Sequence, residues 1–135
     1  MIKKPPVFEF SAGGILYSSG NLLLIKTRNL SGKEVCTFPK GKIENKESSS
    51  DAARREVFEE TGVEAVPEKK LGDTRYLYLR GSRIVIKKVI WYRMRPGETQ
   101  GTAEQGMTPA WHSIPEALSL LSYTGDSMLL KKYFT

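Results

Sequence analysis

Three glutamates crowd into five residues of this chain, at positions 56, 59 and 60. Successive residues of an α-helix turn by ~100°, so on a helix Glu56, Glu59 and Glu60 would fall within roughly a 100° arc. Like charges at this spacing repel by a few tenths of a kcal/mol per pair, and a bound cation would offset that repulsion. Acidic helices are also typical of solvated surfaces, so the three glutamates alone leave both interpretations open.

The residues on either side of the glutamates predict a helix from about 50 to 61. Ser48 to Ser50 supply candidate N-cap residues, Asp51 suits the first turn, and Gly62 suits the position just past the end. The side opposite the glutamates carries small and apolar residues, namely Ala53, Val57 and Phe58. The helix can therefore bury one face while its acids line a cleft.

The residue types available decide what kind of metal such a cluster can hold. The chain has one cysteine, Cys36, and one histidine, His112, which excludes an internal disulfide, a cysteine-based cluster and a histidine-rich site. Any metal must be held by oxygen. Mg²⁺ prefers carboxylate and water oxygens and usually binds beside phosphates, so Mg²⁺ is the expected cofactor and Mn²⁺ its alternative.

Length and composition indicate an ordinary globular chain. Its 135 residues, 39% hydrophobic and 27% charged, suit one domain over 1–135. No apolar run reaches the ~18–20 residues of a membrane span, and the first residues, MIKKPPVFEF, lack the apolar core of a secretory signal. We therefore expect no membrane partner and a cytoplasmic location.

The charge is unevenly distributed along the chain. The net charge is +6, yet residues 41–63 hold six acids and four bases, which leaves +8 for the rest. The cations are scattered without a long basic run, so no nucleic-acid partner is expected. The pattern favours attraction of a small polyanion to a locally acidic site.

The remaining sequence predicts a mixed α+β order of elements. Prolines and glycines break regular structure at residues 39–42, and a polar loop is expected over 96–106. The predicted elements are a hairpin within 8–29, a strand at 35–38, the helix, a hairpin of strands 74–80 and 83–95, a strand at 108–114, a helix over 115–122 and a final helical turn or two within 126–134.

The spacing of the acidic segment resembles the complete signature of the Nudix hydrolases. The matching residues read Gly41, five residues, Glu47, seven residues, Arg55-Glu56-Val57, one residue, Glu59-Glu60, one residue, Gly62-Val63. The resemblance implies an α/β/α sandwich with a mixed central β-sheet. It also implies Mg²⁺-dependent attack of water on a pyrophosphate linkage of a nucleoside diphosphate joined to another group.

The resemblance also implies roles for individual residues. Glu56, Glu59 and Glu60 correspond to metal ligands, and the backbone carbonyl of Lys40 to a further oxygen donor. Glu104, in a loop beyond the signature, would bind a metal or act as general base; the alternative is a solvated loop acid. The residues expected to act in catalysis are Glu59, Glu104, Arg55 and Glu47, the last two by fixing the helix and its ligands.

Outside the signature, the chain looks similar to bacterial hydrolases of diadenosine tetraphosphate and related dinucleoside polyphosphates. The stretches EFSAGGILY, FPKGKIE and IPEALSLLSYTGD carry this similarity. Cys36 departs from it, because many such enzymes have a tryptophan there; we interpret Cys36 as a small buried hydrophobe. The substrate-binding residues implied are Lys40, Lys42, Lys87 or Lys88 for phosphates, and Tyr76 or Tyr78 for a base. Because alternate strand residues face opposite ways, only one of each pair is expected to reach the cleft.

Other substrates fit the same chemistry. The alternatives are an oxidised-nucleotide triphosphatase, an ADP-ribose pyrophosphatase and a diphosphoinositol polyphosphate phosphatase. A non-catalytic nucleotide sensor or RNA-binding module on this scaffold is a different class of function. A module that only binds would have no need of three mutually repelling glutamates, so an enzyme acting on a small-molecule nucleotide, as a monomer or homodimer, is the favoured interpretation.

Overall fold

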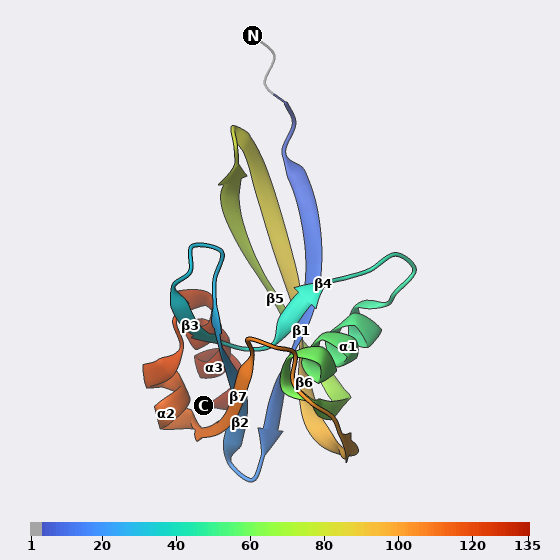
Figure 1. Ribbon diagram of the computed structural model, residues 1–135, viewed down its shortest axis with the longest axis vertical. Coiled ribbons are helices and arrows are strands. Elements are labelled where there is room, and N and C mark those ends of the chain that lie inside the picture. Colours follow the sequence, from blue (N-terminus) through green and yellow to red (C-terminus); the bar gives the residue numbers. More distant parts are fainter. Residues whose placement is uncertain (1–3) are drawn as a thin grey trace.

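The computed structural model describes residues 4–135 and contains seven strands and three helices (Figure 1). The strands are β1 (Val7–Ser18), β2 (Asn21–Arg28), β3 (Glu34–Thr37), β4 (Lys40–Lys42), β5 (Val63–Arg80), β6 (Arg83–Gln100) and β7 (Thr108–Ser113). The helices are α1 (Ser49–Thr61), α2 (Ile114–Leu120) and α3 (Thr124–Phe134). No helix within residues 4–135 combines the length and apolarity that crossing a bilayer requires.

The strands form one mixed sheet. Its order is β3-β2-β1-β6-β5, with β4 paired to β1 and β7 paired to β2. β1 and β6 run parallel over Val7–Leu16 and Val85–Met94, whereas the other pairs are antiparallel. A parallel pair needs a long crossover between its strands, and the segment between β1 and β6 includes α1. The mixed sheet expected from the sequence is confirmed.

The sheet is covered on both faces, because its strands alternate apolar side chains between two cores. On one face, Ala53 and Val57 of α1 pack with Leu16 of β1 and Met94 of β6. On the other face, α2 and α3 cover a core that includes Trp91. Figure 1 shows α1 on one side of the strands and α2 with α3 on the other. This is the expected α/β/α sandwich.

The predicted helix over 50–61 is confirmed as α1, and its ends have the expected caps. The Ser48 side chain accepts a hydrogen bond from the Asp51 amide at 3.0 Å. Gly62 has φ 75° and donates its amide to the Phe58 carbonyl at 2.8 Å. Phe58 itself does not join the buried stripe; its ring is exposed and lies beside Gly101.

The loops expected at residues 39–42 and 96–106 are shorter than predicted, because part of each segment belongs to a strand. Lys40–Lys42 form β4, which pairs with Ser11–Gly13, and β6 continues to Gln100. β5 begins at Val63, directly after α1, although Pro67 lies within it. A proline is tolerated there because β5 is an edge strand of the sheet and its missing N–H deprives no neighbour. The final helical turn or two is the 11-residue helix α3.

Candidate active site

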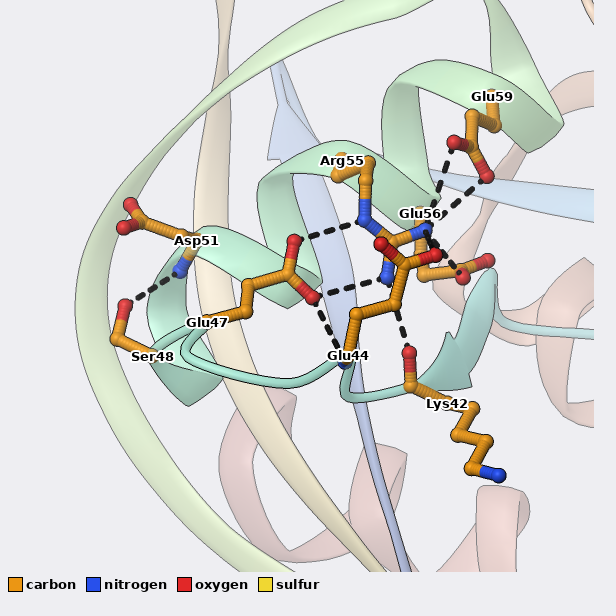
Figure 2. Close-up of polar contacts among 8 residues, drawn as sticks. All are labelled: Lys42, Glu44, Glu47, Ser48, Asp51, Arg55, Glu56 and Glu59. Carbon is orange, nitrogen blue, oxygen red and sulfur yellow. Dashed lines mark hydrogen bonds and ion pairs between the residues drawn. The ribbon is translucent and has the colours of Figure 1, made fainter.

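Arg55 lies at the centre of the polar contacts between α1 and the loop before it (Figure 2). Its Nε and Nη2 donate to the two carboxylate oxygens of Glu47 at 2.7 and 3.0 Å. Its Nη1 donates to Glu56 at 2.8 Å and lies 3.3 Å from Glu59, and its Nη2 reaches the Lys42 carbonyl at 2.9 Å. The guanidinium lowers the pKa of Glu47, so this pair stays ionised and ties the loop to the helix.

Glu56 points from α1 onto the backbone of β4. A Cβ atom on Gly41 would overlap the Glu56 carboxylate, so only glycine permits this approach. Burial raises the pKa of Glu56, and the neighbouring charge of Arg55 opposes that rise. The first glycine of the signature therefore makes room for a carboxylate.

Glu60 is the most buried of the three glutamates, with 8% of its surface exposed. Its Oε1 accepts a hydrogen bond from the backbone amide of Lys40 at 3.1 Å. Burial raises its pKa to about 7, while the Lys40 amide acts in the opposite direction and the charges of Glu56 and Glu104 add to the rise. Glu56 and Glu60 thus both approach β4, the strand that contains Lys40. The backbone carbonyl of Lys40 was the further metal ligand expected from the sequence.

Glu59 and Glu104 meet at the C-terminal end of α1. The Glu59 side chain is 46% exposed. The amide of Glu104, in the loop between β6 and β7, donates to the Glu59 carbonyl at 2.8 Å. The charge of Glu104 also raises the pKa values of Glu56 and Glu60. The loop therefore brings Glu104 to the three glutamates.

The glutamates do not converge on one point as the helix spacing suggested. Among residues 4–135, no group of three or more histidine, cysteine, aspartate or glutamate side chains is arranged to hold a metal ion. Arg55 Nη1 instead contacts both Glu56, at 2.8 Å, and Glu59, at 3.3 Å, and supplies positive charge beside them.

The donor set nonetheless fits a hard divalent cation. Glu60 is buried and the Glu56 side chain is only 13% exposed. Both carboxylates have raised pKa values, and a nearby cation would stabilise their charged forms. Glu47 holds Arg55 through two hydrogen bonds that do not involve Glu59. Glu59 can therefore leave Arg55 for a cation without releasing the guanidinium.

Three of the predicted substrate-binding side chains gather above the sheet. Lys40 Nζ lies 3.5 Å from the Tyr76 hydroxyl and 5.9 Å from the centre of its ring. Lys87 pairs with Tyr76 across β5 and β6, and its Nζ lies 6.0 Å from the same ring. Lys42 is exposed two residues from Lys40 on β4. The result is a cationic surface around one aromatic ring.

Strand alternation separates the two lysines but not the two tyrosines. Lys88 faces the opposite side of the sheet from Lys87 and lies 3.6 Å from Asp73. The expectation that alternation separates Tyr76 from Tyr78 was wrong, because residues two apart share a face; their rings are 6.5 Å apart. The two tyrosines differ instead in the hydrogen bonds that their hydroxyl groups make.

The Tyr78 hydroxyl is engaged within the chain. It donates to Glu9 at 2.8 Å and accepts from Arg80 at 2.8 Å. Among the described residues, the Tyr76 hydroxyl has a single long contact, 3.5 Å from Lys40 Nζ. Tyr76 is therefore the tyrosine better placed to meet a ligand.

Sequence reasoning missed Asp126, a buried acid near the site. Its Oδ2 accepts a hydrogen bond from Thr37 Oγ1 at 2.6 Å, and burial raises its pKa. The contact fastens the first turn of α3 to the end of β3, just before Lys40. A single acid in an apolar tail carries no spacing signal. Cys36 is buried as expected, and burial raises the pKa of its thiol.

The chain is similar in sequence to three curated bacterial proteins. It is 33% identical over 132 residues to a Mycobacterium tuberculosis protein named as a candidate mutator protein, MutT4, covering 91% of this chain and 53% of that protein. It is 35% identical over 83 residues to YtkD of Bacillus subtilis, named as a candidate 8-oxo-dGTP diphosphatase, covering 61% of this chain and 51% of YtkD. It is 30% identical over 100 residues to the 8-oxo-(d)GTP phosphatase of Mycolicibacterium smegmatis, covering 72% and 29%. The chain spans about half or less of each relative.

Solved structures share the fold, and the family follows from the sequence match. A NUDIX hydrolase of Nitrosomonas europaea aligns with a TM-score of 0.75 at 20% identity, covering 96% of this chain and 88% of that one. A MutT protein of Methanosarcina mazei aligns with a TM-score of 0.69 at 22% identity, covering 96% and 95%. The sequence model of the NUDIX domain matches residues 7–132. This chain therefore belongs to the Nudix hydrolase family.

Proposed function

We propose that this chain is a Mg²⁺-dependent hydrolase that splits a nucleoside triphosphate into a monophosphate and diphosphate, with an oxidised purine nucleotide such as 8-oxo-dGTP as substrate. The observation that carries the proposal is the position of Lys40. Its backbone meets Glu60 at 3.1 Å and its side chain meets Tyr76 at 3.5 Å, which joins the carboxylates to a cationic, aromatic surface. The names of two curated relatives supply the substrate class.

The base-binding surface favours a substrate with one base. Tyr76 is flanked by Lys40 and Lys87, whereas Tyr78 is held by Glu9 and Arg80. The buried Cys36 offers no aromatic ring at the position where a tryptophan would stack. One accessible ring suits a mononucleotide better than a dinucleoside polyphosphate, which was the first expectation from the sequence.

Glu56, Glu60 and the Lys40 carbonyl are the groups that would hold Mg²⁺, with Glu59 joining once it leaves Arg55. A bound ion would supply charge to neutralise the phosphates and to lower the pKa of the attacking water. Mn²⁺ has the same preference for oxygen and would be accepted in the same place.

The chain's own residues supply positioning and proton transfer. The Glu47–Arg55 pair fixes α1 against β4 and holds Glu56 in place. The exposed carboxylates of Glu59 and Glu104 are the candidates for accepting the proton of the attacking water. Lys40, Lys42 and Lys87 would neutralise the polyphosphate. A cytoplasmic location, where nucleoside triphosphates are made and used, fits this substrate.

A dinucleoside polyphosphate is the second candidate. The observation that favours it is the pair of tyrosines on one face, because Tyr76 and Tyr78 lie 6.5 Å apart and could each carry a base. Tyr78 would first have to exchange its hydrogen bonds to Glu9 and Arg80 for the ligand. That cost places this candidate behind the mononucleotide.

The test is a substrate panel with Mg²⁺ and with Mn²⁺. The panel holds 8-oxo-dGTP, dGTP, diadenosine tetraphosphate, ADP-ribose and a diphosphoinositol phosphate, and products are identified by mass spectrometry in ¹⁸O-labelled water. We expect the highest kcat/KM for 8-oxo-dGTP, with 8-oxo-dGMP and diphosphate as products. Faster release of ATP from diadenosine tetraphosphate would support the second candidate instead.

Two results would reject an enzyme of this class. A Glu60→Gln variant purified in parallel serves as the control for contaminating activity. Equal rates of hydrolysis by the wild type and by this variant would mean that the activity does not come from the proposed site. Binding of nucleotides without turnover of any panel member, in either metal, would indicate a sensor module.

A further inference from the structure

Ser11 of β1 carries a buried hydroxyl that has no hydrogen-bond partner in the described part of the chain. The residue is 1% exposed. Among residues 4–135, its Oγ is the one buried side-chain nitrogen or oxygen atom without a partner. A buried hydroxyl normally makes at least one hydrogen bond, and burying one without any lowers stability. Alanine would avoid this cost, so the hydroxyl needs a reason outside the fold itself.

Strand register places Ser11 on the face of the sheet that holds the proposed substrate-binding residues. Ser11 pairs with Lys42 of β4 and with Val89 of β6. Paired residues of neighbouring strands share a face, and so do residues two apart on one strand. The face of Ser11 therefore also carries Lys87, two residues before Val89, and its partner Tyr76 on β5.

Ser11 lies between the two ends of the proposed nucleotide site. Toward one end, Gly13 pairs with Lys40, whose backbone meets the buried carboxylates. Toward the other end, Glu9 belongs to the row of Tyr76. Ser11 is the residue of β1 between these two on the same face. A nucleotide with its phosphates at Lys40 and its base at Tyr76 would therefore bring its sugar to Ser11.

Two polar side chains close to Ser11 already have partners. Glu9, two residues away, accepts hydrogen bonds from two side chains of β5, at 2.8 and 3.0 Å. Thr74, in the same row as Ser11, accepts one from Trp91 Nε1 at 2.9 Å. The Ser11 hydroxyl keeps its capacity both to donate and to accept.

Flexible side chains border Ser11, so a ligand can reach it. Lys42 beside it is exposed, and Lys40 and Lys87 are half-buried. The ammonium groups of Lys40 and Lys87 lie 5.9 and 6.0 Å from the centre of the Tyr76 ring. A lysine stem rotates easily, and a polyphosphate would draw these ammonium groups away from the ring onto its own oxygens. That movement would open the face above Ser11.

We propose that Ser11 is a substrate-binding residue whose hydroxyl hydrogen bonds to the 3′-hydroxyl of the sugar. The inference rests on the proposed function, in which the substrate is a deoxynucleotide and its sugar carries only that hydroxyl. Each of the two hydroxyls can donate and accept, so they form a matched pair. The sugar is remote from the bond that is cleaved, so the contact acts on the affinity for the substrate and not on kcat.

Unfolding without substrate separates this role from a structural one. Urea midpoints are measured in EDTA for the wild type, Ser11→Ala and Ser122→Ala. Ser122 is the control, because its hydroxyl accepts a hydrogen bond from the Cys36 amide at 2.8 Å. We expect Ser122→Ala to lower the midpoint and Ser11→Ala to leave it unchanged or to raise it. A midpoint lowered equally in both variants would mean that the Ser11 hydroxyl is bonded within the fold, which overturns the proposal.

Kinetics with two sugars test the contact itself. The substrates are 8-oxo-dGTP and its 2′,3′-dideoxy counterpart, which lacks only the 3′-hydroxyl. For the wild type, removing that hydroxyl is expected to raise KM roughly 3–10-fold at unchanged kcat, as for the loss of one hydrogen bond. Ser11→Ala is expected to show the raised KM with both sugars, because the two losses remove the same contact. Ser122→Ala is expected to discriminate between the sugars as the wild type does.

The outcomes distinguish this proposal from the proposed function. If the wild type hydrolyses 8-oxo-dGTP and Ser11→Ala still prefers it over the dideoxy compound by the wild-type factor, Ser11 does not bind the sugar although the function stands. A lowered kcat at unchanged KM in Ser11→Ala would overturn the proposal in the same way. If the wild type hydrolyses neither compound, the proposed function fails and this proposal fails with it.

Discussion

Glu59 and Glu60 are adjacent in the sequence but occupy different environments at the end of α1. Glu60 is buried against the Lys40 amide, and Glu59 is half exposed beside Arg55. We expect Glu59→Gln and Glu60→Gln each to lower kcat by orders of magnitude with the fold intact, because both carboxylates are proposed to act on the metal or the water. Glu98→Gln, an exposed residue of β6, is the control in the kinetic assay. Turnover near that of the wild type in both variants would remove them from the catalytic site.

The raised pKa of Glu60 predicts how stability changes with pH when no metal is present. Its pKa rises from 4.5 in the ordinary carboxyl to about 7 in the folded chain. Between these values the folded chain keeps a proton that the unfolded chain has released. Stability therefore falls as pH rises from about 4.5 to about 7, by on the order of 1–3 kcal/mol from this group.

Urea unfolding at pH 5 and pH 7.5 in EDTA measures this effect. Other carboxylates titrate in the same range, so the informative quantity is the difference between the wild type and Glu60→Gln. The variant is expected to lose less stability between the two pH values than the wild type. Equal losses would show that Glu60 titrates normally.

Gly41 is the residue whose missing side chain makes room for Glu56. Gly41→Ala would force the new Cβ into the Glu56 carboxylate, so we expect weaker Mg²⁺ binding and at least a tenfold loss of kcat/KM. Isothermal titration with Mg²⁺ and kinetics measure the two effects. Gly125→Ala is the control, because a Cβ there meets no neighbour. If Gly41→Ala and Gly125→Ala have the same Mg²⁺ affinity and the same kcat/KM, the close approach of β4 to Glu56 does not contribute to metal binding or catalysis.

At the scale of elements, the junction of α1 with the Glu104 loop depends on Gly62. Its carbonyl accepts from the Gly101 amide at 2.6 Å, and a Cβ on it would lie 2.6 Å from the Gly101 carbonyl. Gly62→Ala therefore combines strain at positive φ with displacement of the loop. We expect both lower stability in urea unfolding and a reduced kcat.

Gly81→Ala separates these two effects. Gly81 also has positive φ, at 64°, but a Cβ there meets no neighbour. The variant is expected to cost about 1 kcal/mol of stability from backbone strain and to leave kcat unchanged. A kcat reduced equally in both variants would mean that the loop contact does not position Glu104.

The elements that local sequence could predict differ from those it could not. α1 was predicted with both ends because its caps, Ser48 and Gly62, lie within the helix and its flanks. β4 was missed because its three residues follow Pro39 and have a glycine at their centre, so they carry no strand signal of their own. They form a strand only through pairing with β1, which lies some 30 residues earlier.

At the scale of the whole molecule, the net charge of +6 surrounds a locally acidic site. In the proposed function, Lys40, Lys42 and Lys87 attract the polyphosphate of the substrate, so we expect the KM for that substrate to rise with ionic strength between about 0.05 and ~0.5 M salt. Lys87→Gln is expected to raise KM several-fold and to weaken this salt dependence. Lys26→Gln, on an exposed position of β2, is the control. An unchanged KM for Lys87→Gln would exclude Lys87 from substrate binding.

The sequence by itself determined the helix, its caps, the spacing of its glutamates and the family, because all of these depend on residues close along the chain. Pleat alternation likewise sufficed to set Lys87 and Lys88 on opposite faces. Only the tertiary structure decided that one nitrogen of Arg55 contacts both Glu56 and Glu59, that Glu60 is buried at Lys40, and that Lys40, Tyr76 and Lys87 gather from three strands. Burial and pairing between distant segments set these features, and no local pattern records which segments will meet.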